Sequence, residues 1–461
     1  MSVYTPFEKV HEYVLSKLEG TDICFGKKGS YLKVFQAALH YKLNNMPKAK
    51  AGRNYFEFPE VLHWMYFFQL WLRKLGKKRI SLKTYVVIDG GRFQDKTGKS
   101  LFFDKLIQQL GKTSSTHISR KSFNPCTFDY TLDQAENTFC FPSYRFIQQW
   151  KDVRNVYRKA KNSGRFTQEE LDYLAACFHS FILRYGKTIS LFQNQKVHTV
   201  FFIVHYLNEG FISALRDLNI RCVELQHGLI STADLYYVYG ERYTPFLKNA
   251  FFPDFLWVYG NLWKTRLLTG NEHKEKNIVL AGDYTHLFQT ENSNKPDKEN
   301  LLVICTQKFL AADYFPWIDQ VLKHAKNHPE WRVVIKLHPR EKSADVERYL
   351  RYQDDRVQVI QHGDLGEIFK KAKIQLSIYS TTFYDAVGYD IMNFALVDAI
   401  THDSYIREMI DSGVALPIHL EQDPIPLFLQ SQRKPILKRE DIYASFPTPE
   451  VNVWMNQYIQ H

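Results

Sequence analysis

Paired cysteines are absent from this sequence of 461 residues. Its six cysteines are scattered along the chain, at Cys24, Cys126, Cys140, Cys177, Cys222 and Cys305. None of them forms a C-x-x-C pair, so the pattern predicts neither a zinc ribbon nor a disulfide framework. It favours a protein that works in a reducing setting.

A secretion signal and a membrane-spanning run are also missing. The first ten residues, MSVYTPFEKV, contain neither a basic nor an apolar stretch, which predicts a cytoplasmic protein. The apolar run 61–72 has 12 residues, whereas a helix needs about 20 to cross a bilayer. Basic residues follow it at 73–79, and a second basic helical stretch covers 151–165. We interpret each as a helix with a solvated basic side; the alternative is a peripheral contact with the anionic inner face of the cytoplasmic membrane.

The net charge of +11 restricts the classes of partner. A basic protein binds nucleic acid, an anionic membrane surface or a phosphorylated substrate. The sequence has no zinc finger, no basic zipper and no aromatic RNA-binding motif, so nucleic acid is disfavoured.

Continuous apolar strands alternate with helical segments, which is the pattern of parallel sheets covered on both faces. In the first half we predict strands at 83–91, 198–206, 221–228, 255–260 and 277–284. In the second half we predict five more, at 301–307, 331–339, 356–362, 374–380 and 393–398. Ligands of doubly wound domains bind at the carboxyl ends of such strands.

A polar stretch without apolar periodicity, 289–300, predicts a linker between the two halves. We therefore expect an α/β protein with two doubly wound parallel-sheet domains that face each other across a cleft. The first domain would cover 1–288 and the second 301–447. We expect the last segment, 448–461, to form a helix that packs back on the first domain.

The strand predicted at 331–339 ends in three basic residues, Lys336, His338 and Arg340. Pro339 fixes the backbone and keeps His338 extended. Lysine supplies a point charge and histidine a directed hydrogen bond to a phosphate oxygen. The strand end therefore predicts a phosphate site.

Two further groups of polar residues follow strands of the same domain. Ser380, Thr381 and Thr382 stand at a strand-to-helix turn, where hydroxyl groups and free N–H groups bind phosphate. Thr306 and Gln307 end the strand at 301–307. Plain helix capping is the alternative for any one hydroxyl, but their occurrence beside the histidine motif favours a phosphate site.

The first domain has a candidate site of its own at the end of the strand 221–228. Gln226, His227 and Gly228 follow one another there, and we expect the glycine to free the turn. A histidine satisfied by the backbone is the alternative. The adjoining glycine favours a binding site at this turn.

A fourth candidate is the turn after the strand 83–91. Asp89 is a carboxylate at a strand end, and Gly90, Gly91 and Arg92 follow it. The glycines let a ligand come close, so this turn is a further candidate site. The glycine spacing that follows does not fit a phosphate-binding P-loop.

Three motifs in this order resemble the GT-B-fold transferases of bacterial surface polysaccharides: Gln226-His227-Gly228, Lys336-Leu337-His338-Pro339, and Ser380-Thr381-Thr382 with Asp385. They are similar to the capsule-synthesis family, the teichoic-acid glycerophosphotransferases and the bacterial sialyltransferases. The resemblance covers roughly 223–398 and implies a GT-B-like fold. It also implies that the His-Pro motif and the hydroxyl pair hold the phosphate of a donor nucleotide, often a cytidine one. A Glu-x7-Glu pattern is not evident, which favours inversion.

These features predict a glycosyltransferase that moves a sugar from a nucleotide-activated donor, preferably a cytidine one, to a capsular, lipopolysaccharide or lipid-linked glycan. In this interpretation the general base is His227, or as second candidate Asp89, and the acceptor contacts are Gln226, Gly228, Gly90 and Arg92. Neither a cofactor nor a metal is expected, because the cations can offset the charge of the leaving phosphate. Two alternatives stay open: an enzyme that joins polyol phosphates from a CDP-activated donor, and a protein that binds nucleotide sugars without catalysis.

Overall fold

The computed structural model describes thirteen stretches of the chain: 7–44, 81–89, 103–111, 114–119, 130–131, 143–206, 208–234, 236–285, 298–307, 310–339, 341–398, 404–431 and 437–459. The chain divides into two compact units. The N-terminal unit comprises Phe7–Leu287 together with Ser445–His461, and the C-terminal unit is built on Phe288–Ala444. Most of the predicted linker, 289–300, lies outside the described residues.

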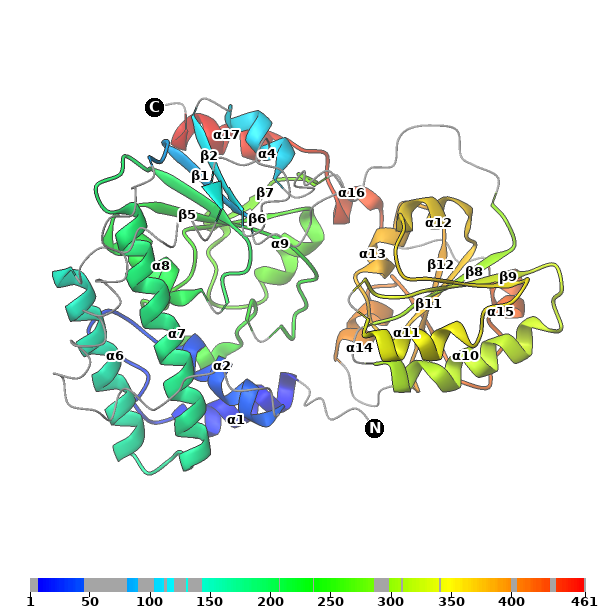
Figure 1. The fold of residues 1–461 in the computed structure, drawn as a ribbon, viewed down its shortest axis with the longest axis horizontal. Helices are drawn as coiled ribbons and strands as arrows, with labels where there is room; N and C mark the ends of the chain where they lie inside the picture. Colours follow the sequence, from blue (N-terminus) through cyan, green and yellow to red (C-terminus); the bar gives the residue numbers. More distant parts are fainter. Residues whose placement is uncertain are drawn as a thin grey trace. The chain divides into compact units, whose positions relative to one another are not determined.

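A parallel sheet forms the centre of the N-terminal unit (Figure 1). Among the described residues it has seven strands in the order β3-β2-β1-β4-β5-β6-β7. These are β1 (Tyr85–Asp89), β2 (Ser115–Ser119), β3 (Tyr130–Thr131), β4 (Thr199–Phe202), β5 (Arg221–Leu225), β6 (Phe255–Val258) and β7 (Ile278–Leu280). The order reverses at β1, so a topological switch point lies between β1 and β4, where doubly wound domains bind their ligands.

Helices cover this sheet and extend beyond it. They are α1 (Phe7–Leu18), α2 (Leu32–Leu43), α4 (Asp104–Leu110), α6 (Tyr144–Asn162), α7 (Gln168–Phe192), α8 (Glu209–Asp217), α9 (Asn261–Leu267) and α17 (Pro449–Tyr458), with short 3-10 turns at Glu241–Phe246 and Glu275–Asn277. Helices α6 and α7 lie side by side (Figure 1). The last helix, α17, packs on the sheet, where Trp454 meets Trp257 edge-on with ring centroids 5.2 Å apart.

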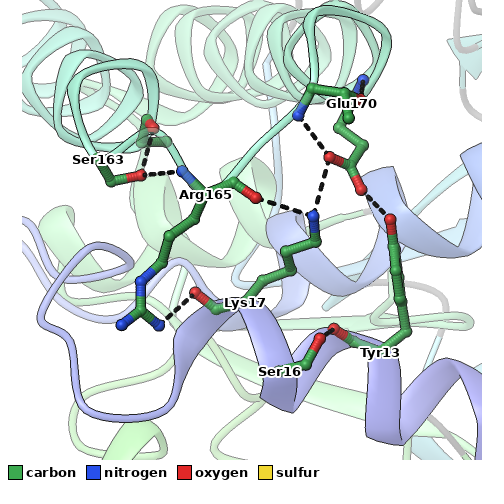
Figure 2. A network of polar contacts seen from close by, with 8 residues as sticks. Tyr13, Ser16, Lys17, Ser163, Arg165 and Glu170 are labelled. Atoms are coloured by element: carbon green, nitrogen blue, oxygen red, sulfur yellow. Dashed lines mark hydrogen bonds and ion pairs between the residues drawn. The ribbon is translucent and has the colours of Figure 1, made fainter.

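Helix α1 is fastened to the start of α7 by one buried carboxylate (Figure 2). Glu170 accepts hydrogen bonds from the Tyr13 hydroxyl, from Lys17 Nζ at 3.1 Å and from the Thr167 N–H at 2.6 Å. Thr167 in turn caps α7 by accepting from the Glu170 N–H. Burial raises the pKa of Glu170, but the hydrogen bonds from Tyr13, Thr167 and Lys17 outweigh it and hold the pKa below its usual range.

The C-terminal unit has a second parallel sheet. Its described strands follow the order β10-β9-β8-β11-β12-β13. They are β8 (Leu301–Cys305), β9 (Arg332–Lys336), β10 (Val357–Ile360), β11 (Ile374–Ser377), β12 (Met392–Leu396) and β13 (Leu416–Ile418). The central strands β8 and β11 are buried along their whole length, because helices cover both faces. The strand order reverses at β8, which puts the switch point between β8 and β11.

The helices of the C-terminal unit connect these strands. They are α10 (Ala311–Ala325), α11 (Ser343–Leu350), α12 (Leu365–Lys371), α13 (Thr382–Val387), α14 (Ser404–Asp411), α15 (Pro424–Gln430) and α16 (Arg439–Ile442). One group of core residues joins the sheet to α12 and α13, with Val303 and Phe369 at most 1% exposed. This packing holds the turns that leave β8 and β11.

The predicted fold class, α/β with two doubly wound parallel sheets, is confirmed by the strand pairing. All ten predicted strands are present, but three others were missed. Strands β2 and β3 carry no continuous apolar run, and β13 contains Pro417, which is tolerated because β13 is an edge strand. The strand predicted at 198–206 ends at Phe202, because Val204 leaves the extended conformation at φ 65°.

We expect Glu170→Gln to lower the free energy of unfolding of the N-terminal unit by about 1–3 kcal/mol, since three donors lose a charged acceptor. The exposed Glu169, one residue earlier on α7, offers a matched control in Glu169→Gln. Because the folded-state pKa of Glu170 is depressed, its stabilisation is present at neutral pH and is lost as the pH falls through that folded value. Urea unfolding of both variants checks this; equal midpoints at neutral pH would contradict it.

Candidate functional site

In the N-terminal unit, the sheet brings the predicted residues to one edge. Asp89 ends β1 and Gln226 directly follows β5, while β4 lies between these two strands. The two candidate bases, Asp89 and His227, therefore belong to turns two strands apart, a separation of about 10 Å. The side chain of Asp89, together with Gly90 and Arg92, lies outside the described residues.

Gln226 anchors the turn that carries the candidate base. Its Nε2 donates to the Gly228 carbonyl at 2.8 Å, and its Oε1 accepts from the Tyr259 N–H at 2.9 Å. Its backbone carbonyl accepts from the Tyr284 hydroxyl at 2.6 Å. Gln226 is 1% exposed. Its side chain thus holds the turn from inside, and its predicted contact with an acceptor stays a prediction.

His227 stands half-buried beside open space. Its Nε2 lies 3.4 Å from the Tyr206 hydroxyl. No heavy atom of the described residues, apart from chain neighbours, lies within 4 Å of the position that a Cβ of Gly228 would take. Gly228 is not in the left-handed region, so the expectation that it frees the turn is wrong. The glycine instead leaves room next to His227.

A buried carboxylate and a buried histidine meet at the same edge, Glu224 near the end of β5 and His205 in the turn after β4. Glu224 and His205 are both fully buried, and Glu224 Oε2 pairs with His205 Nδ1. His205 Nε2 lies 2.9 Å from the Tyr236 carbonyl, and the Tyr237 hydroxyl donates to Glu224 Oε1 at 2.7 Å. Both ring nitrogens of His205 face oxygen atoms, so the ring is held from two sides. Burial raises the pKa of Glu224, but the charge and hydrogen bonds of His205 outweigh it and lower the pKa.

The turn after β4 is strained. Val204 has φ 65°, a left-handed conformation that β-branched residues rarely adopt. Such a residue costs on the order of 1–3 kcal/mol and persists only where its surroundings hold it. Here the His205 N–H donates to Glu224 Oε1 at 3.0 Å, and Asn208 Nδ2 donates to the Val204 carbonyl at 2.5 Å. The buried carboxylate therefore supports the strained turn as well as the histidine.

In the C-terminal unit, three neighbouring strands carry the predicted phosphate residues. The order β9-β8-β11 sets the turn with Thr306 and Gln307 between the His-Pro turn and the Ser-Thr-Thr turn. The Thr306 hydroxyl accepts from the His338 N–H at 3.1 Å. Gln307 Oε1 accepts from the Tyr379 N–H at 3.2 Å, directly before Ser380. The middle turn thus fastens the other two.

Lys336 supports the His-Pro turn from within. Its Nζ donates to the Leu337 carbonyl at 3.0 Å and to the Gln361 carbonyl at 2.9 Å. Burial lowers the pKa of Lys336, whose side chain is 7% exposed. His338, by contrast, is half-buried at the edge. The predicted contact of Lys336 with phosphate stays a prediction, and Arg340 lies outside the described residues.

The three hydroxyls of the Ser-Thr-Thr turn differ in their surroundings. Thr382 Oγ1 accepts from Gln375 Nε2 at 2.5 Å. Ser380 Oγ accepts from the Thr382 N–H at 3.3 Å and keeps its own proton as a donor. Thr381 is exposed at the start of α13, and no side-chain cap bond is formed there. Ser380 and Thr381 are therefore the hydroxyls that can reach an anion outside the turn.

Sequence reasoning missed residues that hold both edges. Tyr314 on α10 is fully buried, and its hydroxyl donates to the Cys305 carbonyl at 2.9 Å and accepts from the Ile378 N–H at 3.1 Å. It ties the ends of β8 and β11 together. His205 and Tyr206 were assigned to a strand. Two polar residues directly after an apolar run can indicate a site at a strand end. Nothing in the sequence, however, shows that β4 ends at Phe202 and that these residues lie in the turn after it.

Two further expectations concern metals and membranes. Across the described stretches, no group of three His, Cys, Asp or Glu side chains is arranged to hold a metal ion. A search of the same stretches finds no helix with the length and apolarity to span a bilayer. The basic stretch 73–79 lies outside them. The second basic stretch forms the later part of α6, where Lys151 and Arg158 are exposed while Asp152 is buried.

Comparisons with known proteins give distant likenesses only. No protein family and no curated protein matches the sequence. Similar solved structures include the UDP-GlcNAc 2-epimerase of Neisseria meningitidis bound to UDP-GlcNAc, with a TM-score of 0.46 and 13% identity over 82% of this chain and 100% of that chain. MurG of Acinetobacter baumannii has a TM-score of 0.41 and 12% identity over 82% and 100%. The wall teichoic acid polymerase TagF with CDPG has a TM-score of 0.41 and 10% identity over 86% and 91%. Neither a reaction nor a substrate follows from likenesses this distant.

We expect Gln226→Ala to loosen the turn that carries His227, because the Tyr259 N–H and the Gly228 carbonyl lose their partner in the interior. Each buried group left without a hydrogen bond costs about 1–3 kcal/mol. Hydrogen exchange followed by mass spectrometry should show faster exchange in the peptides around 223–230 and 257–260. Gln148→Ala, an exposed glutamine on α6, is the control. Unchanged exchange in Gln226→Ala would show that the amide does not hold the turn.

Proposed function

We propose that the chain is a GT-B-like glycosyltransferase that uses a nucleotide-activated sugar donor and a glycan acceptor of the bacterial surface. One observation carries the proposal. Three polar turns meet at the reversal of strand order in the C-terminal sheet, joined by hydrogen bonds from His338 to Thr306 and from Tyr379 to Gln307. Such a reversal is where doubly wound domains bind nucleotides.

The donor phosphate binds at this edge in the proposal. His338 is half-buried, Ser380 keeps a hydroxyl proton to donate, and Thr381 is exposed. The imidazole and the hydroxyl groups supply directed hydrogen bonds, while Lys336 lies behind them and stabilises negative charge. Helix α13 has six residues, so the side chains contribute more than its dipole does. The resemblance of these motifs to surface-polysaccharide transferases supports a cytidine nucleotide such as a CMP-sugar.

The acceptor binds at the corresponding edge of the N-terminal unit in the proposal. His227 is half-buried there, and the space beside Gly228 is free of described atoms. Gln226 fixes the turn, so the imidazole stays in one place. The preferred base is therefore His227, with Asp89 of β1 as the second candidate.

The proposed chemistry is a single displacement with inversion. The acceptor hydroxyl gives its proton to the base as its oxygen forms a bond to the anomeric carbon. The bond from that carbon to the phosphate oxygen breaks, and the nucleotide leaves with the electron pair. His338, Ser380 and Thr381 offset the charge that grows on the leaving phosphate. The residues named can do this without a metal ion.

The place of action in the proposal is the cytoplasm, with a peripheral contact to the anionic inner membrane surface where lipid-linked glycans are found. The exposed cations of α6, among them Lys151 and Arg158, support such a contact, because basic residues near an anionic surface are attracted to it.

The donor prediction is tested by thermal shift with CMP, CDP, UDP, GDP and dTDP. We expect a cytidine nucleotide to raise the melting temperature most, since a ligand at about 100 times its Kd adds about 2.7 kcal/mol to the folded state. His338→Ala should remove the shift without lowering the melting temperature of the free protein. His362→Ala, an exposed histidine after β10, is the control. No shift with any nucleotide would refute the proposed donor site.

The base prediction is tested by transfer from the sugar nucleotide that the thermal shift selects. We expect His227→Ala to lower the rate of transfer by about 10²–10⁴-fold, the usual contribution of a positioned base, with donor affinity unchanged. His198→Ala, an exposed histidine at the opposite edge of the same sheet, should leave the rate unchanged. If Asp89→Asn abolishes transfer while His227→Ala mainly weakens nucleotide binding, the two roles are reversed. Full activity in both variants would eliminate both bases.

A further inference from the structure

The turn after β4 presents one side chain to the candidate base. Tyr206 follows the strained Val204 and the buried His205 directly. Its ring stacks on Tyr236 with centroids 4.7 Å apart and planes 18° from parallel. Its hydroxyl lies 3.4 Å from His227 Nε2.

The backbone that carries this tyrosine is held in place by the residue before it, His205. The His205 N–H and ring are bound to Glu224, which locks the turn to β5. His205 Nε2 faces the carbonyl of Tyr236, the residue on which Tyr206 stacks. A strained left-handed valine is retained at this point, and retained strain is concentrated at functional sites. This strain is independent of the contact with His227 and points to the same residue.

The orientation of the His227 ring determines which of its nitrogens contacts Tyr206. Its Nδ1 is buried, whereas its Nε2 faces the Tyr206 hydroxyl. Nε2 is therefore the nitrogen that can take a proton through this contact. A phenol hydroxyl can donate to the lone pair of a neutral imidazole and can accept from the N–H of a protonated one. One contact can thus hold the ring before and after it takes a proton.

We propose that Tyr206 carries the acceptor's proton to His227: the phenol hydroxyl gives its proton to the lone pair of Nε2 while its oxygen takes the proton of the acceptor hydroxyl, so that the phenol is regenerated and the imidazole is protonated. The role in transfer rests on the proposed function, whereas the contact itself does not. Tyr206→Phe keeps the ring and its stack on Tyr236 and removes only the hydroxyl. In transfer assays it should lower kcat several-fold and leave the KM for the donor unchanged.

The deciding experiment needs neither donor nor acceptor, so its failure is distinct from failure of the proposed function. Diethyl pyrocarbonate modifies neutral imidazole nitrogens, and mass spectrometry of the peptide with His227 gives the rate of modification at each pH. We expect Tyr206→Phe to raise this rate several-fold and to shift its pH midpoint. Tyr13→Phe, which removes a hydroxyl bonded to Glu170 elsewhere in the unit, is the matched control.

The outcomes separate the explanations. A change at His227 in Tyr206→Phe alone supports the proposal. If neither variant changes the rate or the pH midpoint, the hydroxyl does not hold His227 and the proposal is overturned. If both variants change it equally, the effect is general loosening of the unit, and the specific role of Tyr206 is likewise overturned.

Discussion

In both units every registered strand pair runs parallel, so the carboxyl ends of all described strands of a sheet lie at one edge. This constraint brings Thr306, His338 and Ser380 together, although more than seventy residues of chain separate the first from the last. It also creates a difficulty. The turns leave the sheet with backbone groups that have lost their ladder partners, and close packing excludes water from many of them. A buried group of this kind costs free energy unless another polar group binds it. The edge therefore needs polar side chains for structural reasons before it can use any for function.

Both edges meet this need in the same way. A buried polar side chain binds the backbone of a turn, and a half-buried histidine stands beside it. Gln226 does this for His227, and Lys336 with Thr306 does it for His338. The buried side chain and the histidine differ in their importance for stability. Removing the buried side chain leaves interior backbone groups without a hydrogen bond, whereas the histidine is already partly in solvent. Polar residues adjacent in sequence thus divide into those that hold the turn and those that remain available to a ligand.

This division explains what the sequence could and could not predict. Strand β8 is apolar on both faces and β11 is buried along its whole length, so their positions follow from the sequence, and so does the edge at which Lys336 and Ser380 lie. The direction of a side chain at that edge does not follow. Lys336 lies at a strand end as predicted, yet its ammonium group binds two carbonyls. The left-handed Val204 was also beyond sequence reasoning, because a β-branched residue after an apolar run indicates continued strand. The partners that hold it, Glu224 among them, are distant in sequence.

The buried ionisable groups of the N-terminal unit differ in whether their surroundings favour the charged form. Burial lowers the pKa of Lys33 to about 7 and raises the pKa of Glu272 to about 8, so both charged forms are disfavoured. Lys33 Nζ lies 3.7 Å from the centroid of the Phe252 ring, and the face of the ring attracts the positive charge that burial disfavours. Glu224 behaves in the opposite way, because His205 faces it directly and keeps it ionised. The attraction between Glu224 and His227 lowers the pKa of Glu224 further. The folded structure therefore stabilises the ionised form of a buried carboxylate directly beneath the turn that carries His227.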